Sequence, residues 1–274
     1  IMGIYYLLNI FDEMISPASD YFMVLLAFYV LIKWLELLER KEQSYFPYAL
    51  LCVMGVMIVS VKLSGALLLL LVLRPAWQMI REKRVGEILK FAGVGFLTAA
   101  PFLVRNVLLS GWLVYPFTAV DLFDFDFKIP KGMADYDAKE IQVWGRGFSD
   151  VTRYDEPAVK WLPEWAAGLD AVNKLFLALA ISGVVVLALL AVYAFVRKKR
   201  DMADYLYIGF VVAVCFLFWL TSAPLIRYGC IFLWLCPVLT WGYLYLGISP
   251  HTDRFRVYAV LVLLLAAYKA GAFG

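Results

Sequence analysis

Histidine is almost absent from this chain, since His251 is the only one among 274 residues. The topology argued below places His251 in a cytoplasmic turn, so no imidazole faces the opposite side of the membrane. Ser-His-Asp hydrolysis and a His-based zinc site are therefore excluded for this sequence. A GxxxxGK[ST] phosphate loop is also missing, and the GxG at Gly145-Arg146-Gly147 is too common a pattern to indicate a nucleotide site. We expect no ATP-driven mechanism within this chain.

Cysteine and charge are scarce as well. The four cysteines fall within apolar runs and show no CxxC spacing. We expect them to be small buried core residues, which say nothing about the redox compartment. Charged residues make up only 17% of the chain, and we find no repeat, no low-complexity linker and no signal peptide. These absences leave no sign of a separate soluble domain.

Apolar residues dominate the sequence. They make up 64% of it, and the mean hydropathy is +0.80, whereas soluble proteins contain about 45–50% apolar residues. A membrane-spanning helix needs about 20 residues. Nine apolar runs of about this order, the first of them shorter, are bounded by charge: 1–11, 20–38, 46–61, 64–80, 87–109, 174–196, 204–222, 228–247 and 256–273. We therefore predict an all-α integral membrane protein, a polytopic helical bundle that forms one domain over residues 1–274.

The first run is too short to span a membrane, because residues 1–11 would rise only about 16 Å as a helix. The chain also opens on Ile1 rather than Met. We expect further sequence before it, including additional helices.

Basic residues cluster in every second connection between the runs. The clusters are Arg40-Lys41, then Arg74 with Arg81, Lys83 and Arg84, then residues 197–200, and finally Arg254 with Arg256. An excess of Lys and Arg marks cytoplasmic connections. Residues 12–19, 62–64 and 221–227 and the long polar segment at about 106–173 are then predicted to be extracytoplasmic. We call this long segment the polar insert.

The polar insert is slightly acidic, with 8 Lys/Arg and 11 Asp/Glu from Arg105 to Lys174. Nucleic acid is therefore not an expected partner, because its binding needs a basic surface. Residues 117–127 alternate aromatic with acidic side chains, which is typical of short amphipathic helices on the outer leaflet or of an ordinary aromatic belt. Pro163 is predicted to begin a short helix. Asp121, Asp124 and Asp126 lack the glycine spacing of a calcium loop, so a divalent metal is possible there but not indicated.

Acids near the start of the chain are candidates for the catalytic base. Asp12 and Glu13 have no evident structural role beyond solvation, and Asp20 stands where it could cap a helix that starts at Ser19 or Asp20. Both the catalytic and the structural interpretations stay open for these residues.

Three isolated cations fall in the predicted outer connections: Lys62, Arg105 and Arg227. Lys62 interrupts an otherwise apolar stretch, and an ionisable residue at such a position is a functional candidate, with a simple hairpin turn at Lys62 and Gly65 as the alternative. A guanidinium group matches phosphate oxygens with two parallel donors. Snorkelling to the interface is the alternative for each arginine. Because topology brings all three to one face, we expect them to bind an anion there.

The segments around these cations resemble a known superfamily. Residues 62–64, the segment Pro101-Phe102-Leu103-Val104-Arg105-Asn106 with residues 110–116 (SGWLVYP), and the segment Ser222-Ala223-Pro224-Leu225-Ile226-Arg227-Tyr228 are similar to poorly characterised bacterial members of the GT-C membrane glycosyltransferases. The likeness runs from about Ser16 to Tyr228.

This resemblance implies an enzyme of the bacterial cytoplasmic membrane that transfers a sugar from a polyprenyl-phosphate carrier to a glycan, lipid or protein acceptor on the extracytoplasmic face. It implies that Lys62, Arg105 and Arg227 bind the carrier phosphate and that an outer-face acid (Asp12, Glu13, Asp20 or one in the expected preceding sequence) is the base. Asn106, Tyr228, Asp121 and Asp124 are then candidates for contacts with the acceptor. Cations preplaced at the leaving phosphate would stabilise the transition state. A flippase for a lipid-linked glycan and a polysaccharide polymerase or ligase remain alternative functions.

Overall fold

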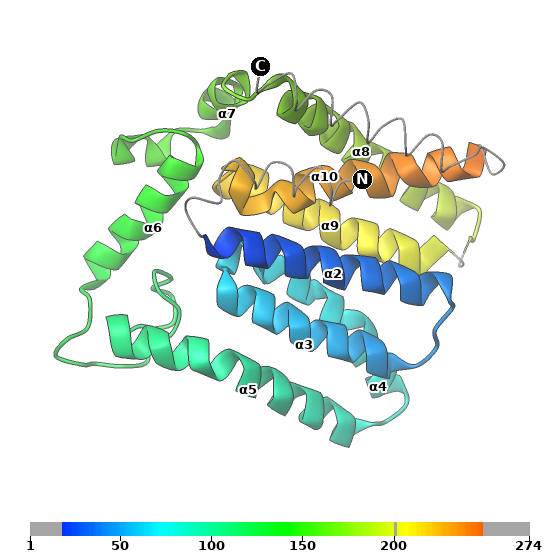
Figure 1. Ribbon diagram of the computed structural model, residues 1–274, viewed down its shortest axis with the longest axis horizontal. Helices are drawn as coiled ribbons and strands as arrows, with labels where there is room; N and C mark the ends of the chain where they lie inside the picture. Colours follow the sequence, from blue (N-terminus) through cyan, green and yellow to red (C-terminus); the bar gives the residue numbers. More distant parts are fainter. Residues whose placement is uncertain (1–17, 200–201, 249–274) are drawn as a thin grey trace, which may run out of the picture.

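The computed structural model describes residues 18–199 and 202–248, and within these ranges the regular structure is helical with no strand. The elements in chain order are α2 (Ser19–Glu39), α3 (Tyr45–Val61), η1 (Leu63–Val72), α4 (Leu73–Arg81), α5 (Val85–Ser110), α6 (Lys131–Gly145), η2 (Val151–Asp155), α7 (Ala158–Ala167), α8 (Ala171–Val196), α9 (Ala203–Ser222) and α10 (Ile226–Ile248). Figure 1 shows the long helices side by side, with α6 and α7 at the end of the bundle where α2 and α10 begin.

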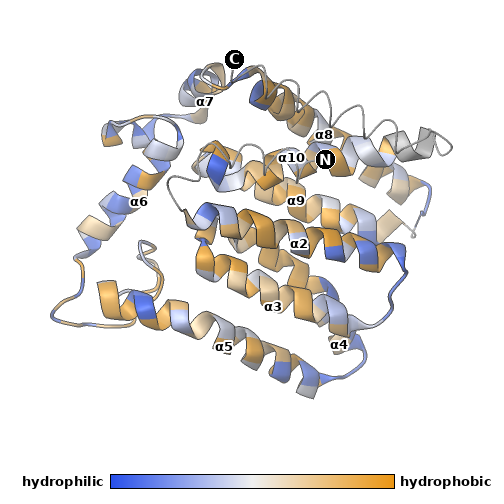
Figure 2. Ribbon diagram, in the orientation of Figure 1, coloured by the Kyte–Doolittle hydropathy of each residue, from blue (hydrophilic) through white to orange (hydrophobic). Residues whose placement is uncertain are grey.

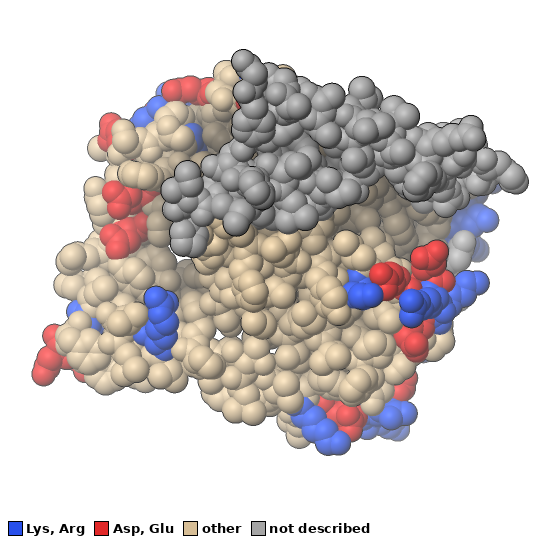
Figure 3. Space-filling view, in the orientation of Figure 1, with Lys and Arg blue, Asp and Glu red and all other residues tan. Residues whose placement is uncertain are grey.

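Five helical segments of the described part are long and apolar enough to cross a membrane: Ser19–Glu39, Leu63–Arg81, Val85–Ser110, Ala171–Val196 and Ala203–Ser222. Apolar side chains along α5 and α8 face outward; Leu97 is 69% exposed and Leu189 is 64% exposed. In Figure 2 the long helices are largely orange, while blue gathers in α6 and at the connections. Charged side chains leave a broad uncharged band between the two ends of the face seen in Figure 3. The described part is therefore all helical, with five helices that could span a membrane, which is compatible with the helical membrane protein predicted from the sequence.

The predicted runs between 20 and 247 coincide with helices, and runs 1–11 and 256–273 lie outside the described residues. Local sequence explains several boundaries. Ser44 accepts a hydrogen bond from the Phe46 amide before α3, and Asp170 accepts one from the Asn173 amide before α8. Gly111 takes a left-handed conformation (φ 74°) directly after α5, which a residue with a side chain rarely adopts.

Helix α2 begins differently from the sequence expectation. Neither Ser19 nor Asp20 is the N-cap; Ala18 holds that position and makes no side-chain cap. Asp20 is buried in the first turn instead. The reason is tertiary, because the carboxylate binds cations from two other segments.

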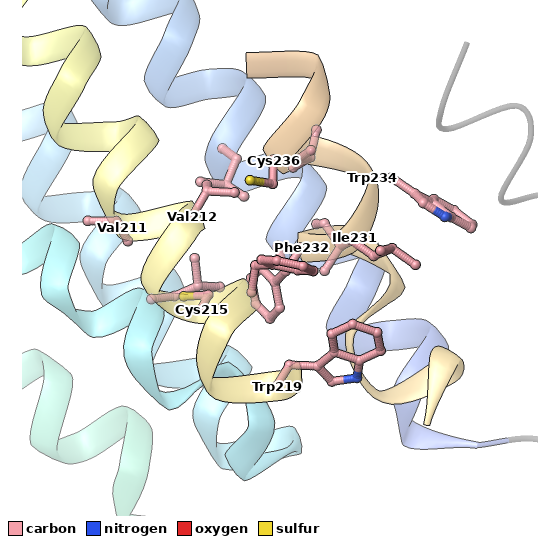
Figure 4. Close-up of a cluster of buried hydrophobic side chains, with 14 of the residues drawn as sticks. Val211, Val212, Cys215, Trp219, Ile231, Phe232, Trp234 and Cys236 are labelled. Atoms are coloured by element: carbon pink, nitrogen blue, oxygen red, sulfur yellow. The ribbon is translucent and has the colours of Figure 1, made fainter. Parts of the chain in front are cut away.

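The buried core lies where α9 and α10 pack together and against α2 and η1. Figure 4 shows its side chains from α9 (Val211, Val212, Cys215 and Trp219) and from α10 (Ile231, Phe232, Trp234 and Cys236). All four cysteines are buried, as expected. At the α9–α10 crossing a Cβ on Gly229 would overlap the Trp219 ring, so the close approach of the two helices requires glycine.

In the polar insert, the interpretation of residues 117–127 as amphipathic helix and the predicted helix start at Pro163 are both wrong. Residues 117–127 form no helix; Phe123, Phe125 and Phe127 stack with ring centroids 5.5 and 5.1 Å apart. A spacing of two puts side chains on one side of an extended chain, which explains the stacking. Helix α7 begins at Ala158, and Pro163 lies inside it rather than at its start.

Candidate functional site

A buried carboxylate joins two of the predicted cations at one end of the bundle. The side chain of Asp20, in the first turn of α2, is 4% exposed and accepts a hydrogen bond from the Lys62 ammonium. Its other oxygen lies 3.5 Å from Nε of Arg227, in the first turn of α10. Three segments that are far apart in the sequence therefore meet at Asp20.

The backbone places Lys62 at this point by a sharp reversal. Lys62 follows α3 with extended dihedral angles (φ −154°, ψ 126°), and the chain continues into η1, which packs back against α3. Gly65 allows this packing, because a Cβ there would lie 2.6 Å from Cγ2 of Ile58. The hairpin turn expected at Lys62 and Gly65 is thus present, and it presents the ammonium to Asp20.

Tyr228 closes the cluster from α10. Its ring centroid lies 3.5 Å from Nζ of Lys62, and its carbonyl accepts a hydrogen bond of 3.1 Å from Oγ of Ser64. An ammonium over an aromatic face is attracted by the ring quadrupole. We call Asp20, Lys62, Arg227 and Tyr228 the Asp20 cluster.

The charges of the Asp20 cluster do not cancel. One buried carboxylate faces two cations, and the Arg227 side chain is 47% exposed. Close like charges repel, and an anion placed beside them would relieve that repulsion. The cluster therefore favours a negatively charged ligand on the exposed side of Arg227.

A pocket of about 750 Å³ lies next to Arg227. The beginning of α10, the insert and α2 line it: Leu225, Ile226, Arg227, Arg146, Gly147, Phe148, Glu164, Trp165, Gly168, Leu169 and Tyr21. Its wall thus combines two arginines and one carboxylate with aromatic and aliphatic side chains. A cavity of this size and mixed lining is typical of sites for small ligands.

Arg146 lines this pocket but was overlooked in the sequence. It sits directly after α6 and is only 7% exposed. The GxG pattern around it carries no specific signal, and a lone arginine in a charged insert does not reveal burial. Only the tertiary packing shows its burial, because the guanidinium carbon lies 4.6 Å from the ring centroid of Trp161 and 5.7 Å from that of Tyr154.

Other predicted site residues lie elsewhere. Arg105 is exposed on α5 and is not among the residues that line the pocket, while Asn106 is buried and donates to the Phe102 carbonyl within the same helix. Asp121 pairs with Lys128, and Asp124 is exposed in the extended part of the insert. The structure therefore brings together Asp20, Lys62, Arg227 and Tyr228. Arg105, Asn106, Asp121 and Asp124 are not among the residues that line the pocket.

Asp12, Glu13 and His251 lie outside the described residues. Among residues 18–199 and 202–248, no group of three or more His, Cys, Asp or Glu side chains is placed to hold a metal ion. Within the described residues, the candidate site therefore consists of cations, carboxylates and aromatic rings.

Comparison with known proteins adds one finding. A family model described as "Domain of unknown function (DUF8201)" matches residues 1–234. No curated protein and no solved structure shows significant similarity to the chain.

Proposed function

We propose that this chain, which belongs to the DUF8201 family, is a membrane glycosyltransferase that uses a polyprenyl-phosphate sugar as donor. The description of the family names no activity. The observation that carries the proposal is the Asp20 cluster beside the pocket, at one end of a bundle of apolar helices. The nine predicted spans, the bacterial cytoplasmic membrane and the extracytoplasmic position of the polar insert are parts of the same proposal.

The location suits a ligand with a lipid tail and a charged head. Apolar helix surfaces such as those of α5 and α8 are compatible with an isoprenoid chain. At the end of the bundle, Lys62 and Arg227 offer positive charge at the level where a phosphate attached to that chain would lie. Aromatic side chains in the pocket, Trp165 and Phe148, provide flat apolar surface for a sugar ring.

In the proposed reaction an acceptor hydroxyl attacks the anomeric carbon of the donor sugar. The bond between that carbon and the carrier phosphate breaks, its electron pair leaves on the phosphate oxygen, and the hydroxyl proton passes to a carboxylate. Lys62 and Arg227 stabilise the negative charge that develops on the leaving phosphate. Loss of one such donor lowers kcat by about 10²–10³-fold in enzymes.

Asp20 serves this site best as a positioning residue. Its side chain is 4% exposed and both of its oxygens face cations, so it holds Lys62 and Arg227 in place. The proton acceptor is then an acid that the acceptor can reach, for which Asp12 and Glu13 remain predictions. A role for Arg105 at the carrier phosphate also remains a prediction, since it lies outside the pocket lining.

The test uses the full chain in proteoliposomes that contain undecaprenyl-phosphate glucose or mannose labelled in the sugar, with a membrane extract as the source of acceptors. We expect label to leave the carrier, and Arg227→Gln to slow this by about 10²-fold or more. The control is Arg197→Gln, which removes an exposed arginine after α8. Transfer at the parental rate by Arg227→Gln would show that Arg227 does not bind the phosphate. Label that crosses the bilayer while still attached to the carrier would assign the protein to transport instead.

A further inference from the structure

Arg146 is a buried cation without a carboxylate partner in the described part of the chain. Its Nη1 donates to the Tyr154 carbonyl at 2.9 Å, its Nε is buried without a hydrogen bond, and none of the ion pairs between described residues includes it. Burial lowers the pKa of Arg146, which records the cost of keeping this charge away from water. A buried guanidinium that lacks an anion is costly, so a binding partner is expected.

The acidic residue in the pocket lining already has an arginine partner. Glu164 lines the pocket with Arg146, but it accepts hydrogen bonds from Arg153 at 2.7 and 3.3 Å. Arg153 also binds Glu156 at 2.9 Å. Both acids therefore bind Arg153 and form no ion pair with Arg146, on which Glu156 acts only from a distance.

The pocket thus has, on each of two walls, one arginine that has no carboxylate to itself. Arg227 comes from α10 and shares Asp20 with Lys62, and Arg146 comes from the end of α6. Figure 1 shows α6 at the end of the bundle where α10 begins, so the two walls belong to different parts of the molecule. One phosphate at Arg227 would leave Arg146 without a partner.

We propose that Arg146 and Arg227 together bind a diphosphate group, so that the pocket prefers a lipid diphosphate carrier to a lipid monophosphate carrier. Guanidinium groups match phosphoryl oxygens through paired N–H donors, and two of them in the lining of one pocket suit two linked phosphoryl groups. This inference rests on the proposed function and names the carrier class for the same pocket. It requires nothing of Arg146 in the chemical step beyond binding and orienting the second phosphoryl group.

A purely structural role for Arg146 predicts a different result. Its bond to the Tyr154 carbonyl and its contact with Trp161 connect α6 to η2 and α7. If that were its whole purpose, its removal would weaken the fold or the binding of every lipid alike. A preference between two carriers is therefore the informative measurement.

The experiment measures binding of undecaprenyl diphosphate and of undecaprenyl monophosphate to the full chain in detergent micelles, by quenching of tryptophan fluorescence. We expect the native chain to bind the diphosphate about tenfold or more tightly, which corresponds to about 1.4 kcal/mol. Arg146→Gln should abolish this preference while it leaves monophosphate binding intact, and Arg146→Lys should restore part of it. Arg197→Gln serves as the matched control and should keep the full preference.

Equal binding of the two lipids by the native chain would overturn the proposal, and so would a preserved preference in Arg146→Gln. If Arg146→Gln weakened the binding of both lipids equally, Arg146 would have a structural role only. The thermal midpoint of unfolding would then also be lower than in the native chain. Inorganic pyrophosphate is the third ligand tested. If it binds as tightly as undecaprenyl diphosphate, the lipid tail contributes nothing to binding, and the proposal that the ligand is a lipid-linked diphosphate is wrong. Sugar release from the carrier tests the proposed function separately, because it can succeed with a monophosphate donor even when this preference is absent.

Discussion

Asp20 is the residue on which the arrangement of the site most depends, and Asp20→Asn is the sharpest test of it. The substitution keeps the shape of the side chain but removes its charge. Lys62 and Arg227 would then face each other beside a neutral amide, with the Asp20 side chain 4% exposed in the native protein. We expect a marked loss of stability, because buried charges are tolerated only while they are paired.

The magnitude follows from the geometry. Unit charges 3.5 Å apart, the distance from Asp20 to Arg227, attract by about 5 kcal/mol at an effective dielectric constant of about 20. Desolvation opposes much of this attraction, and removal of one partner from a buried pair usually costs about 3–5 kcal/mol. We therefore expect Asp20→Asn to lower the free energy of unfolding by about 3 kcal/mol or more.

The assay is a double-mutant cycle with Asp20→Asn, Lys62→Met and the combined variant, followed by chemical unfolding in micelles. Because Lys62→Met also removes one of the stranded cations, the double variant should recover about 1–3 kcal/mol relative to the sum of the single changes. Arg197→Gln, which removes an exposed arginine after α8, is the reference and should change the free energy of unfolding by about 0.5 kcal/mol or less. If the single variants proved additive, or if Asp20→Asn were as stable as the native chain, the buried pairing inferred for Asp20 would be wrong.

Two further predictions follow from the packing and from the insert. Gly229→Ala should lower the free energy of unfolding by about 1–3 kcal/mol, because the added Cβ would overlap the Trp219 ring. The thermal midpoint of this variant should drop. Gly242→Ala is the control and should change the midpoint little, because its Cβ would meet open space. Burial and the hydrogen bond to Asp137 raise the pKa of Tyr115 to about 12 from an ordinary value of 10.0. The neutral Tyr115 hydroxyl therefore stabilises the folded chain fully below pH 10.0, and this contribution is lost as the pH rises towards about 12. The free energy of unfolding should therefore fall less between pH 9 and 11.5 in Tyr115→Phe than in the native chain; an equal fall in both would contradict this assignment.

Helical membrane architecture could be predicted well because it depends on local composition. Apolar runs of about the bilayer thickness form helices whatever their neighbours are, since every backbone polar group must be satisfied within the segment. Local signals in the insert were weaker. The spacing of Phe123, Phe125 and Phe127 fits an extended chain, whereas the aromatic and acidic composition left an amphipathic helix and an aromatic belt as open interpretations.

The site could be predicted in part for a related reason. Lys62 and Arg227 stand out in the sequence because charge is rare in apolar surroundings, and alternating traversals bring both to one end of the bundle. The same reasoning included Arg105, yet the direction in which α5 presents that side chain depends on packing, and it is exposed. The pairing of Asp20 with two cations also depended on packing, since a helix-capping role fitted the sequence equally well.

By itself, the sequence of this protein determined where its long apolar helices lie within the described part, and it indicated that Lys62 and Arg227 share one end of the bundle. These properties depend on composition and on the direction of each traversal. The tertiary structure alone decided that Asp20 is a shared counterion, that Arg146 is buried on a pocket wall, and that Glu164 is bound to Arg153. Such choices depend on distances of a few ångströms between segments remote in the chain, because the energy of a charge is set by its burial and by its nearest partner.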